Sequence, residues 1–166
     1  MVGGDGVFTS VDGGDTWLPL TQGLGETSVT SLVRNPANPG TLFAGTINEP
    51  YRSLTMGIGW EEVMGIPAFG VSAITAGTSE ADRVYAAAQV TFPFSRPSVY
   101  VSFDNGISWT SVSNGSNAVS RIESLTASPL DPSLLYAATS QGVYVQRLVV
   151  IFADGFESGG SAAWAP

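Results

Sequence analysis

The sequence predicts an all-β fold in which a unit of four short strands repeats about three times. Three observations predict it: an eight-residue motif recurs along the chain, similar strand-like segments flank each copy, and no long window shows the 3.6-residue period of a helix. Four-stranded units that repeat every 40–50 residues or so are typical of β-propeller blades, whose radial stacking buries both faces of each small sheet. We therefore expect a β-propeller segment of about three blades that belongs to a larger propeller.

The recurring motif brings a serine, an aspartate, a glycine, a hydroxyl and a tryptophan together within eight residues. SVDGGDTW and SFDNGISW both fit the pattern S-x-D-x-G-x-[ST]-W, whereas SLTMGIGW lies between them and lacks the aspartate and the second hydroxyl. The motif residues are Ser10, Asp12, Gly14, Thr16 and Trp17 in the first copy, Ser53, Gly57 and Trp60 in the second, and Ser102, Asp104, Gly106, Ser108 and Trp109 in the third.

Two strand-like segments complete each unit. The first reads VTSL, VSAI and IESL at residues 29–32, 71–74 and 122–125, and the second reads LFAGT, VYAAA and LYAAT at 42–46, 84–88 and 135–139. Proline-rich turns at 35–40 and 128–132 separate them in the first and third units, because proline fixes φ and removes a ladder donor. Each unit is therefore predicted to consist of an inner strand, an alanine-rich strand, a strand entering the motif and a strand leaving it.

The motif aspartates allow a functional and a structural interpretation. Asp12 and Asp104 could be metal ligands or acids, or their carboxylates could accept hydrogen bonds within their own turns while glycine supplies a positive φ. Recurrence favours the structural role, because a catalytic residue is needed once and a turn fastener once per blade. We expect Trp17 and Trp109 to pack under these turns as anchors.

The motif and its flanking strands resemble the Asp-box, or BNR repeat, of sialidases, sortilin-type receptors, xyloglucanase-like glycoside hydrolases and photosystem assembly-factor-like propellers. The resemblance covers residues 6 to about 147, with two full copies and one partial copy of the motif. It implies a propeller whose motif turns lie on the outer rim, away from the central face that binds ligands. It does not select one function, because these propellers host unrelated activities.

The register of the repeat predicts the domain boundaries. GDGVFTS at residues 4–10 matches only the second half of LYAATSQGVYV at 135–145, so the chain is expected to begin inside a blade. We expect blades over residues 1–147 and a C-terminal strand with a polar tail over 148–166. Three arrangements stay open: a closed three-bladed ring, the favoured C-terminal part of a larger propeller, and self-association through open blade edges.

The C-terminal tail bears on localisation. DGFESGGSAAW at residues 154–164 resembles the DGFESG…W tails of exported bacterial proteins, which implies a natural C-terminus and an extracellular or periplasmic full-length parent. The first ten residues contain neither the basic nor the apolar region of a signal peptide. A compatible interpretation is that residues 148–153 form the outer strand of the last blade.

Composition restricts the available chemistry and partners. The six basic residues are all arginines and the net charge is −8, so no nucleic-acid partner is expected, because phosphate binding needs clustered positive charge. The chain has no histidine and no cysteine, which excludes Ser-His-Asp and Cys-His catalysis and the usual zinc sites. We expect no cofactor and no metal. The apolar run at 148–153 is far shorter than the roughly 20 residues of a membrane span, so no membrane insertion is expected.

Few residues are candidates for a site. Phe92, Phe94 and Arg96 could stack on a sugar or peptide, although their loop also fits an ordinary insertion between strands. Glu61 and Glu62 are adjacent and would point to opposite faces of a strand, so they cannot flank one glycosidic bond. The arginines are scattered, whereas the resemblance to sialidases would require a cluster. The leading hypothesis is a non-catalytic, exported propeller that binds a carbohydrate or protein ligand or acts as a scaffold. The alternative is a C-terminal fragment of a glycoside hydrolase or sialidase-like enzyme.

Overall fold

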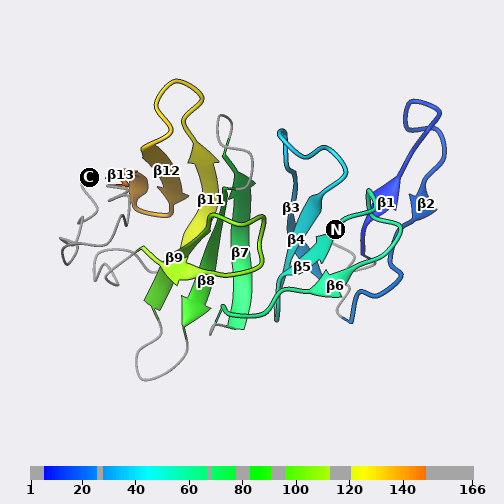
Figure 1. Cartoon of the computed structure of the whole chain (residues 1–166), viewed down its shortest axis with the longest axis horizontal. Helices are drawn as coiled ribbons and strands as arrows, with labels where there is room; N and C mark the ends of the chain where they lie inside the picture. Colours follow the sequence, from blue (N-terminus) through cyan, green and yellow to red (C-terminus); the bar gives the residue numbers. More distant parts are fainter. Residues whose placement is uncertain are drawn as a thin grey trace.

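The computed structural model describes residues 6–25, 28–66, 69–77, 83–90, 96–112 and 121–148. Every regular element in these ranges is a β-strand, and the strands form four antiparallel sheets that follow one another along the molecule (Figure 1). The first sheet contains β1 (Phe8–Thr9) and β2 (Leu18–Pro19); the second β3 (Val29–Arg34), β4 (Leu42–Thr46), β5 (Tyr51–Ser53) and β6 (Glu61–Glu62); the third β7 (Phe69–Ala76), β8 (Val84–Val90), β9 (Arg96–Ser102) and β10 (Thr110–Ser111); and the fourth β11 (Ile122–Ala127), β12 (Leu134–Thr139) and β13 (Gly142–Arg147).

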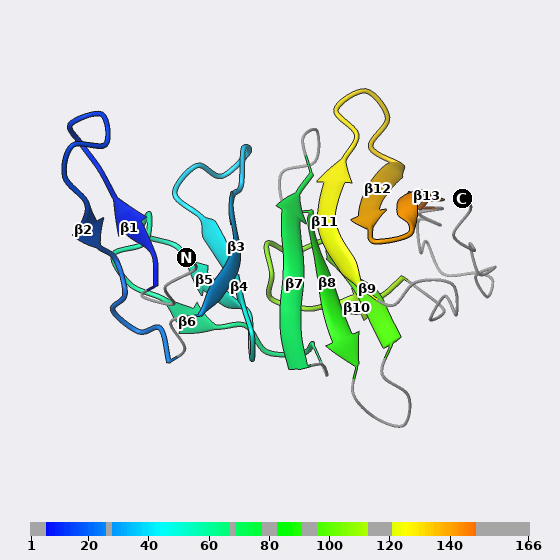
Figure 2. The same ribbon diagram turned by 180° about the vertical axis from the view of Figure 1, so that it is seen from behind.

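Each sheet is a meander in which every strand pairs with its neighbour in the sequence. The strands that open the second, third and fourth sheets lie next to one another, with β7 between β3 and β11 (Figures 1 and 2). The predicted all-β class with four-stranded antiparallel units is confirmed for the second and third sheets. Within the described residues, the first sheet has two strands and the fourth has three. The predicted C-terminal tail follows Leu148 and is not among the described residues.

Alternation along the strands gives the second and third sheets buried apolar side chains on both faces. On β4, Ala44 joins a buried cluster with Val7, which directly precedes β1, whereas Phe43 faces the third sheet in a cluster with Val84 and Tyr100. Fully burying a side chain such as that of Phe43 contributes about 1.5–3 kcal/mol. The hydrophobic core therefore consists of layers between successive sheets. Over the described part of the chain, no helix is long and apolar enough to span a membrane.

Candidate functional site

The first motif copy forms a tight turn, here named turn 1 (residues 10–17), between β1 and β2. The Asp12 carboxylate accepts hydrogen bonds from the Thr16 N–H at 3.0 Å, the Thr16 hydroxyl at 2.5 Å and the Ser10 hydroxyl at 2.8 Å. Ser10 Oγ in turn accepts the Gly14 N–H at 2.8 Å, and Trp17 Nε1 donates to the Gly14 carbonyl at 3.0 Å. The polar groups of the motif therefore bind one another across the turn.

Turn 3 (residues 102–109) repeats this geometry between β9 and β10. Asp104 accepts the Ser108 N–H at 2.8 Å, the Ser108 hydroxyl at 2.5 Å and the Ser102 hydroxyl at 2.7 Å. Gly106 lies at φ +82°, where a side chain would strain the backbone, and its N–H donates to Ser102 Oγ at 2.8 Å. The same five positions thus perform the same local task in both turns.

Turn 2 (residues 53–60) keeps this arrangement without an aspartate. Thr55 stands at the aspartate position, and its hydroxyl oxygen accepts the Gly59 N–H at 3.1 Å while lying 3.3 Å from Ser53 Oγ. Ser53 Oγ accepts the Gly57 N–H at 2.9 Å, as serine does in the other two turns. Sequence reasoning missed Thr55, because the motif was compared by residue type and not by the presence of an acceptor oxygen.

The hydrogen bonds of turns 1 and 3 lower the pKa of both motif aspartates. The Thr16 hydroxyl is the largest cause for Asp12, followed by the Thr16 N–H and the Ser10 hydroxyl. For Asp104, burial raises the pKa, but hydrogen bonds from Ser108 and Ser102 outweigh it and bring the pKa to about 2. A general acid needs the opposite shift, because it must hold its proton near neutral pH. These carboxylates are therefore suited to fastening turns.

The pKa of Asp104 predicts how its contribution to stability depends on pH. The folded value of about 2 lies below the ordinary 3.8, so the ionised carboxylate stabilises the fold above about pH 4, and this stabilisation is lost as the pH falls through 2. We expect Asp104→Asn to be less stable than wild type at pH 7 and the difference to shrink between pH 4 and pH 2. Urea unfolding across this pH range measures it. A difference that stays constant down to pH 2 would contradict the proposed role of the charge.

A second feature is a groove where the inner strands of three sheets meet, here named the axial groove. Its volume is about 230 Å³, and it is lined by Thr30, Thr46, Ile47, Gly70, Val71, Ser72, Gln89 and Arg121. The hydroxyls of Thr30 and Ser72 donate to the carbonyls of Val71 and Ile122, so they connect neighbouring sheets. Arg121 is the charged residue of the lining, and its Nε lies 3.3 Å from Glu123 in an ion pair whose side chains are more than half exposed.

Comparison with known proteins identifies the architecture. No protein-family model and no curated protein matches the chain. Among solved structures, an ancestral GH74 enzyme superimposes on 85% of this chain with a TM-score of 0.70 at 21% sequence identity. YCF48 from Cyanidioschyzon merolae superimposes on 71% with a TM-score of 0.56 at 16% identity. The chain is a β-propeller segment. It spans 20% of the GH74 enzyme and 36% of YCF48.

In the propeller segment, the axial groove and the motif turns lie at opposite ends of the blade strands. The residues that line the groove lie at the starts of β3 and β7 and at the ends of β4 and β8. Turn 3 follows the end of β9, and its Asn105 contacts Thr41, which directly precedes the start of β4. Antiparallel pairing of β8 with β9 places these features at opposite ends of the blade. A ligand in the axial groove would therefore not touch the motif aspartates.

The arginines of the propeller segment do not converge on one point. Arg52 pairs with Glu61 at 2.6 Å and Arg83 lies 5.1 Å from the centroid of the Phe103 ring. The others described contact separate groups: Arg34 Nε donates to the Pro39 carbonyl, Arg121 pairs with Glu123, and Arg147 pairs with Asp131. No arginine cluster of the kind that a sialidase requires is formed by these side chains.

The remaining candidate residues from the sequence do not form a site within the described part of the chain. Glu61 and Glu62 form the exposed strand β6, where successive residues point to opposite faces. Phe92 and Phe94 lie outside the described residues, and Arg96 begins β9 without a described side chain. Within the described ranges, no three carboxylates gather in an arrangement that could hold a metal ion.

Trp17 and Trp109 were expected to be anchors: Trp109 is half-buried and packs against the cluster around Phe43, whereas Trp17 is not buried. Trp60, from the degraded copy, is only 6% exposed, whereas Trp17 is 60% exposed. Trp60 packs with Val7 of the first blade, and its Nε1 donates to the Leu20 carbonyl at 2.8 Å. The motif sets the turn, but the preceding blade buries the tryptophan.

Proposed function

We propose that this chain is part of a non-catalytic, exported β-propeller that binds a carbohydrate or peptide ligand in the axial groove. The observation that carries the proposal is the chemistry of the groove: three blades contribute to its lining, and none of the described lining residues carries a carboxylate. The strongly hydrogen-bonded aspartates lie in the turns instead. Export rests on the resemblance of residues 154–164 to the tails of exported bacterial proteins.

The lining favours a ligand that combines hydrogen-bond donors, such as sugar hydroxyls, with a carboxylate. The hydroxyls of Thr30 and Ser72 already donate to propeller carbonyls, so they offer a ligand mainly their acceptor lone pairs. Arg121 supplies the positive charge, and its present partner is the exposed Glu123. An exposed ion pair of this kind is worth about 0–1 kcal/mol, so a ligand carboxylate can replace Glu123 at little cost.

Binding and hydrolysis can be tested on the same protein. We expect no release of reducing sugar from xyloglucan and no cleavage of an aryl sialoside. We expect oligogalacturonate, a carboxylate-bearing probe, to shift the amide signals of Gln89 and Arg121 in an NMR titration. Arg121→Ala should weaken this binding by up to about fivefold, because an exposed ion pair contributes about 0–1 kcal/mol.

Arg34→Ala is the matched control, because Arg34 is an exposed arginine at the far end of β3 and lies outside the groove lining. It should leave the affinity for oligogalacturonate unchanged. Equal loss in both variants would indicate non-specific attraction of an anion. An affinity for oligogalacturonate that Arg121→Ala leaves unchanged would exclude the groove as the binding site.

A second candidate function is that of a fragment of a glycoside hydrolase. The fold shared with an ancestral GH74 enzyme favours it. In this alternative the catalytic carboxylates are not the motif aspartates Asp12 and Asp104, which are held ionised in their turns. Turnover of xyloglucan by the purified chain would support this alternative over the binding function.

A further inference from the structure

Turn 3 is attached to the second blade by the side chain and carbonyl of Asn105. This residue has a left-handed φ of 55° and directly precedes Gly106. Its Oδ1 accepts a hydrogen bond from Asn35 Nδ2 at 3.0 Å, and its Nδ2 donates to Thr41 Oγ1 at 3.4 Å. Arg52 Nη1 donates to the Asn105 carbonyl at 2.8 Å. Three residues of the preceding blade therefore hold Asn105.

This attachment lies inside the interface between the second and third blades, both of which have four described strands. Asn35 and Thr41 are 0% and 1% exposed. Beside them, a Cβ added to Gly106 would come within 2.5 Å of the Phe43 ring. The backbone of turn 3 therefore lies directly on the second blade.

An asparagine that is followed by glycine can lose its side-chain amide spontaneously, because glycine has no Cβ beside the attacking nitrogen. In this reaction the Gly106 nitrogen bonds to Asn105 Cγ, the bond from Cγ to the side-chain nitrogen breaks, and ammonia leaves. The product is a cyclic succinimide. Water then opens one of its two imide bonds and yields aspartate or isoaspartate, and isoaspartate adds a methylene group to the main chain.

The folded turn withholds both reacting groups. The Gly106 N–H donates to Ser102 Oγ at 2.8 Å in a buried bond, which occupies the attacking nitrogen. Asn35 and Thr41 bind the two ends of the Asn105 amide, which fixes the side chain away from that nitrogen. The reaction therefore needs a local opening in which turn 3 leaves the second blade.

We propose that Asn105 is a deamidation site that is gated by the contact between the second and third blades. The reaction proceeds only while turn 3 is detached. Isoaspartate then prevents its return, because the longer main chain would have to fit against Phe43, where a Cβ on Gly106 already has no room. Deamidation thus converts a reversible local opening into a permanent one.

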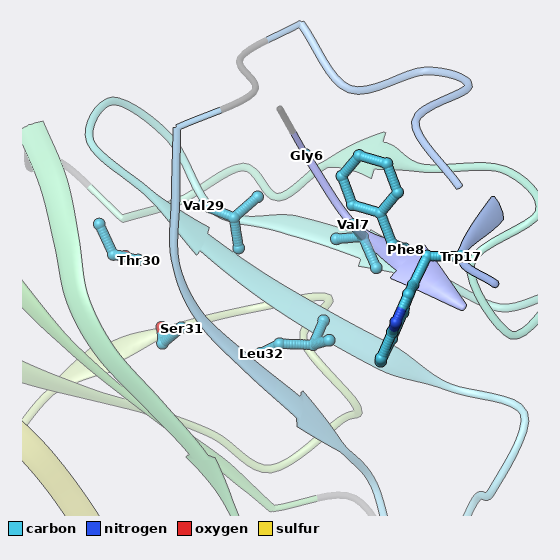
Figure 3. A pocket seen from close by; sticks show the side chains of 8 residues that line it. All are labelled: Gly6, Val7, Phe8, Trp17, Val29, Thr30, Ser31 and Leu32. Carbon is cyan, nitrogen blue, oxygen red and sulfur yellow. The ribbon is translucent and has the colours of Figure 1, made fainter. Parts of the chain in front are cut away.

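Turn 1 is a matched turn without this attachment. Gly13 holds the position of Asn105 at φ +78°, and a Cβ added to it would meet nothing within 4 Å. The Gly14 N–H donates to Ser10 Oγ at 2.8 Å, the same distance as the corresponding bond of turn 3. Trp17, the last residue of turn 1, borders an open groove along β3 (Figure 3). The local hydrogen bond is shared, and the contact with another blade is what differs.

Gly13→Asn tests the gate within one molecule, because it places an asparagine before Gly14 in turn 1. The folded variant is incubated at mildly alkaline pH, and peptide mapping by mass spectrometry measures aspartate and isoaspartate at each site. We expect position 13 to deamidate at least about fivefold faster than Asn105, because detaching turn 3 breaks at least two hydrogen bonds. In urea, where the chain is unfolded, the two sites should react at similar rates. Equal rates in the folded variant would overturn the proposal.

Asn35→Asp tests the bond that closes the gate. It keeps the Oδ1 acceptor for the backbone N–H groups of Ala37 and Asn38 but removes the amide that donates to Asn105. We expect Asn105 to deamidate about two- to tenfold faster than in the wild type, the factor that one net hydrogen bond represents.

Asn38→Asp is the control for this variant, because it makes the same chemical change at an exposed asparagine of the same loop. It should leave the rate at Asn105 unchanged. Peptide mapping must separate Asn105 from Asn114, the other asparagine that precedes a glycine. Gly13→Asn leaves turn 3 intact, so its result stands even if Asn35→Asp does not fold. A folded Asn35→Asp with the wild-type rate, or an equal acceleration in Asn38→Asp, would contradict the gate.

Discussion

Replacing Trp60 by alanine should lower the free energy of unfolding by about 3–5 kcal/mol, the usual cost of emptying a buried aromatic site. The indole is 6% exposed and packs with Val7, Ala44 and Tyr51 between the first and second blades. Its Nε1 also donates to the Leu20 carbonyl at 2.8 Å, a bond that no alanine can replace. Urea unfolding at a concentration where the chain is monomeric measures the change.

Trp17→Ala is the matched control for this prediction, because Trp17 holds the same motif position but is 60% exposed. Its loss should cost under about 1 kcal/mol, as for most surface substitutions. Equal losses in the two variants would contradict the inference that the neighbouring blade, and not the motif, provides the stabilisation.

The motif predicted the local turns from sequence because their chemistry is contained within eight residues. This type of turn needs a serine, an acceptor oxygen and a glycine. In turn 1 these are supplied by Ser10, Asp12 and Gly14, which can be recognised from the sequence by residue type. Thr55 was not predicted, although a threonine hydroxyl also offers an acceptor oxygen. A search by hydrogen-bonding capacity would have found it.

The axial groove could not be predicted from sequence in the same way. Its lining comes from β3, β4, β7, β8 and the residue before β11, which only the stacking of three blades brings together. The one available signal was that Arg121 directly precedes an inner strand. The different burial of Trp17 and Trp60 has the same cause, because burial depends on a neighbouring blade that local sequence does not specify.

Gly106 offers a second large effect, because it combines an unusual backbone conformation with close packing. At φ +82° an alanine would be strained by about 1–2 kcal/mol, and its Cβ would lie 2.5 Å from Phe43 Cε1. Phe43 is 0% exposed and has no room to withdraw, so overpacking adds about 1–3 kcal/mol. We expect Gly106→Ala to lower the free energy of unfolding by about 2–5 kcal/mol in urea titrations.

Gly14→Ala separates the two causes of that loss. Gly14 has the same motif position and a φ of +102°, but its added Cβ would meet only the Trp17 ring at the ordinary distance of 3.9 Å. Backbone strain alone should then cost about 1–2 kcal/mol, so the difference between the two variants measures how tightly turn 3 is packed on Phe43. If both alanine variants lost the same stability, the contact between turn 3 and the preceding blade would carry little energy.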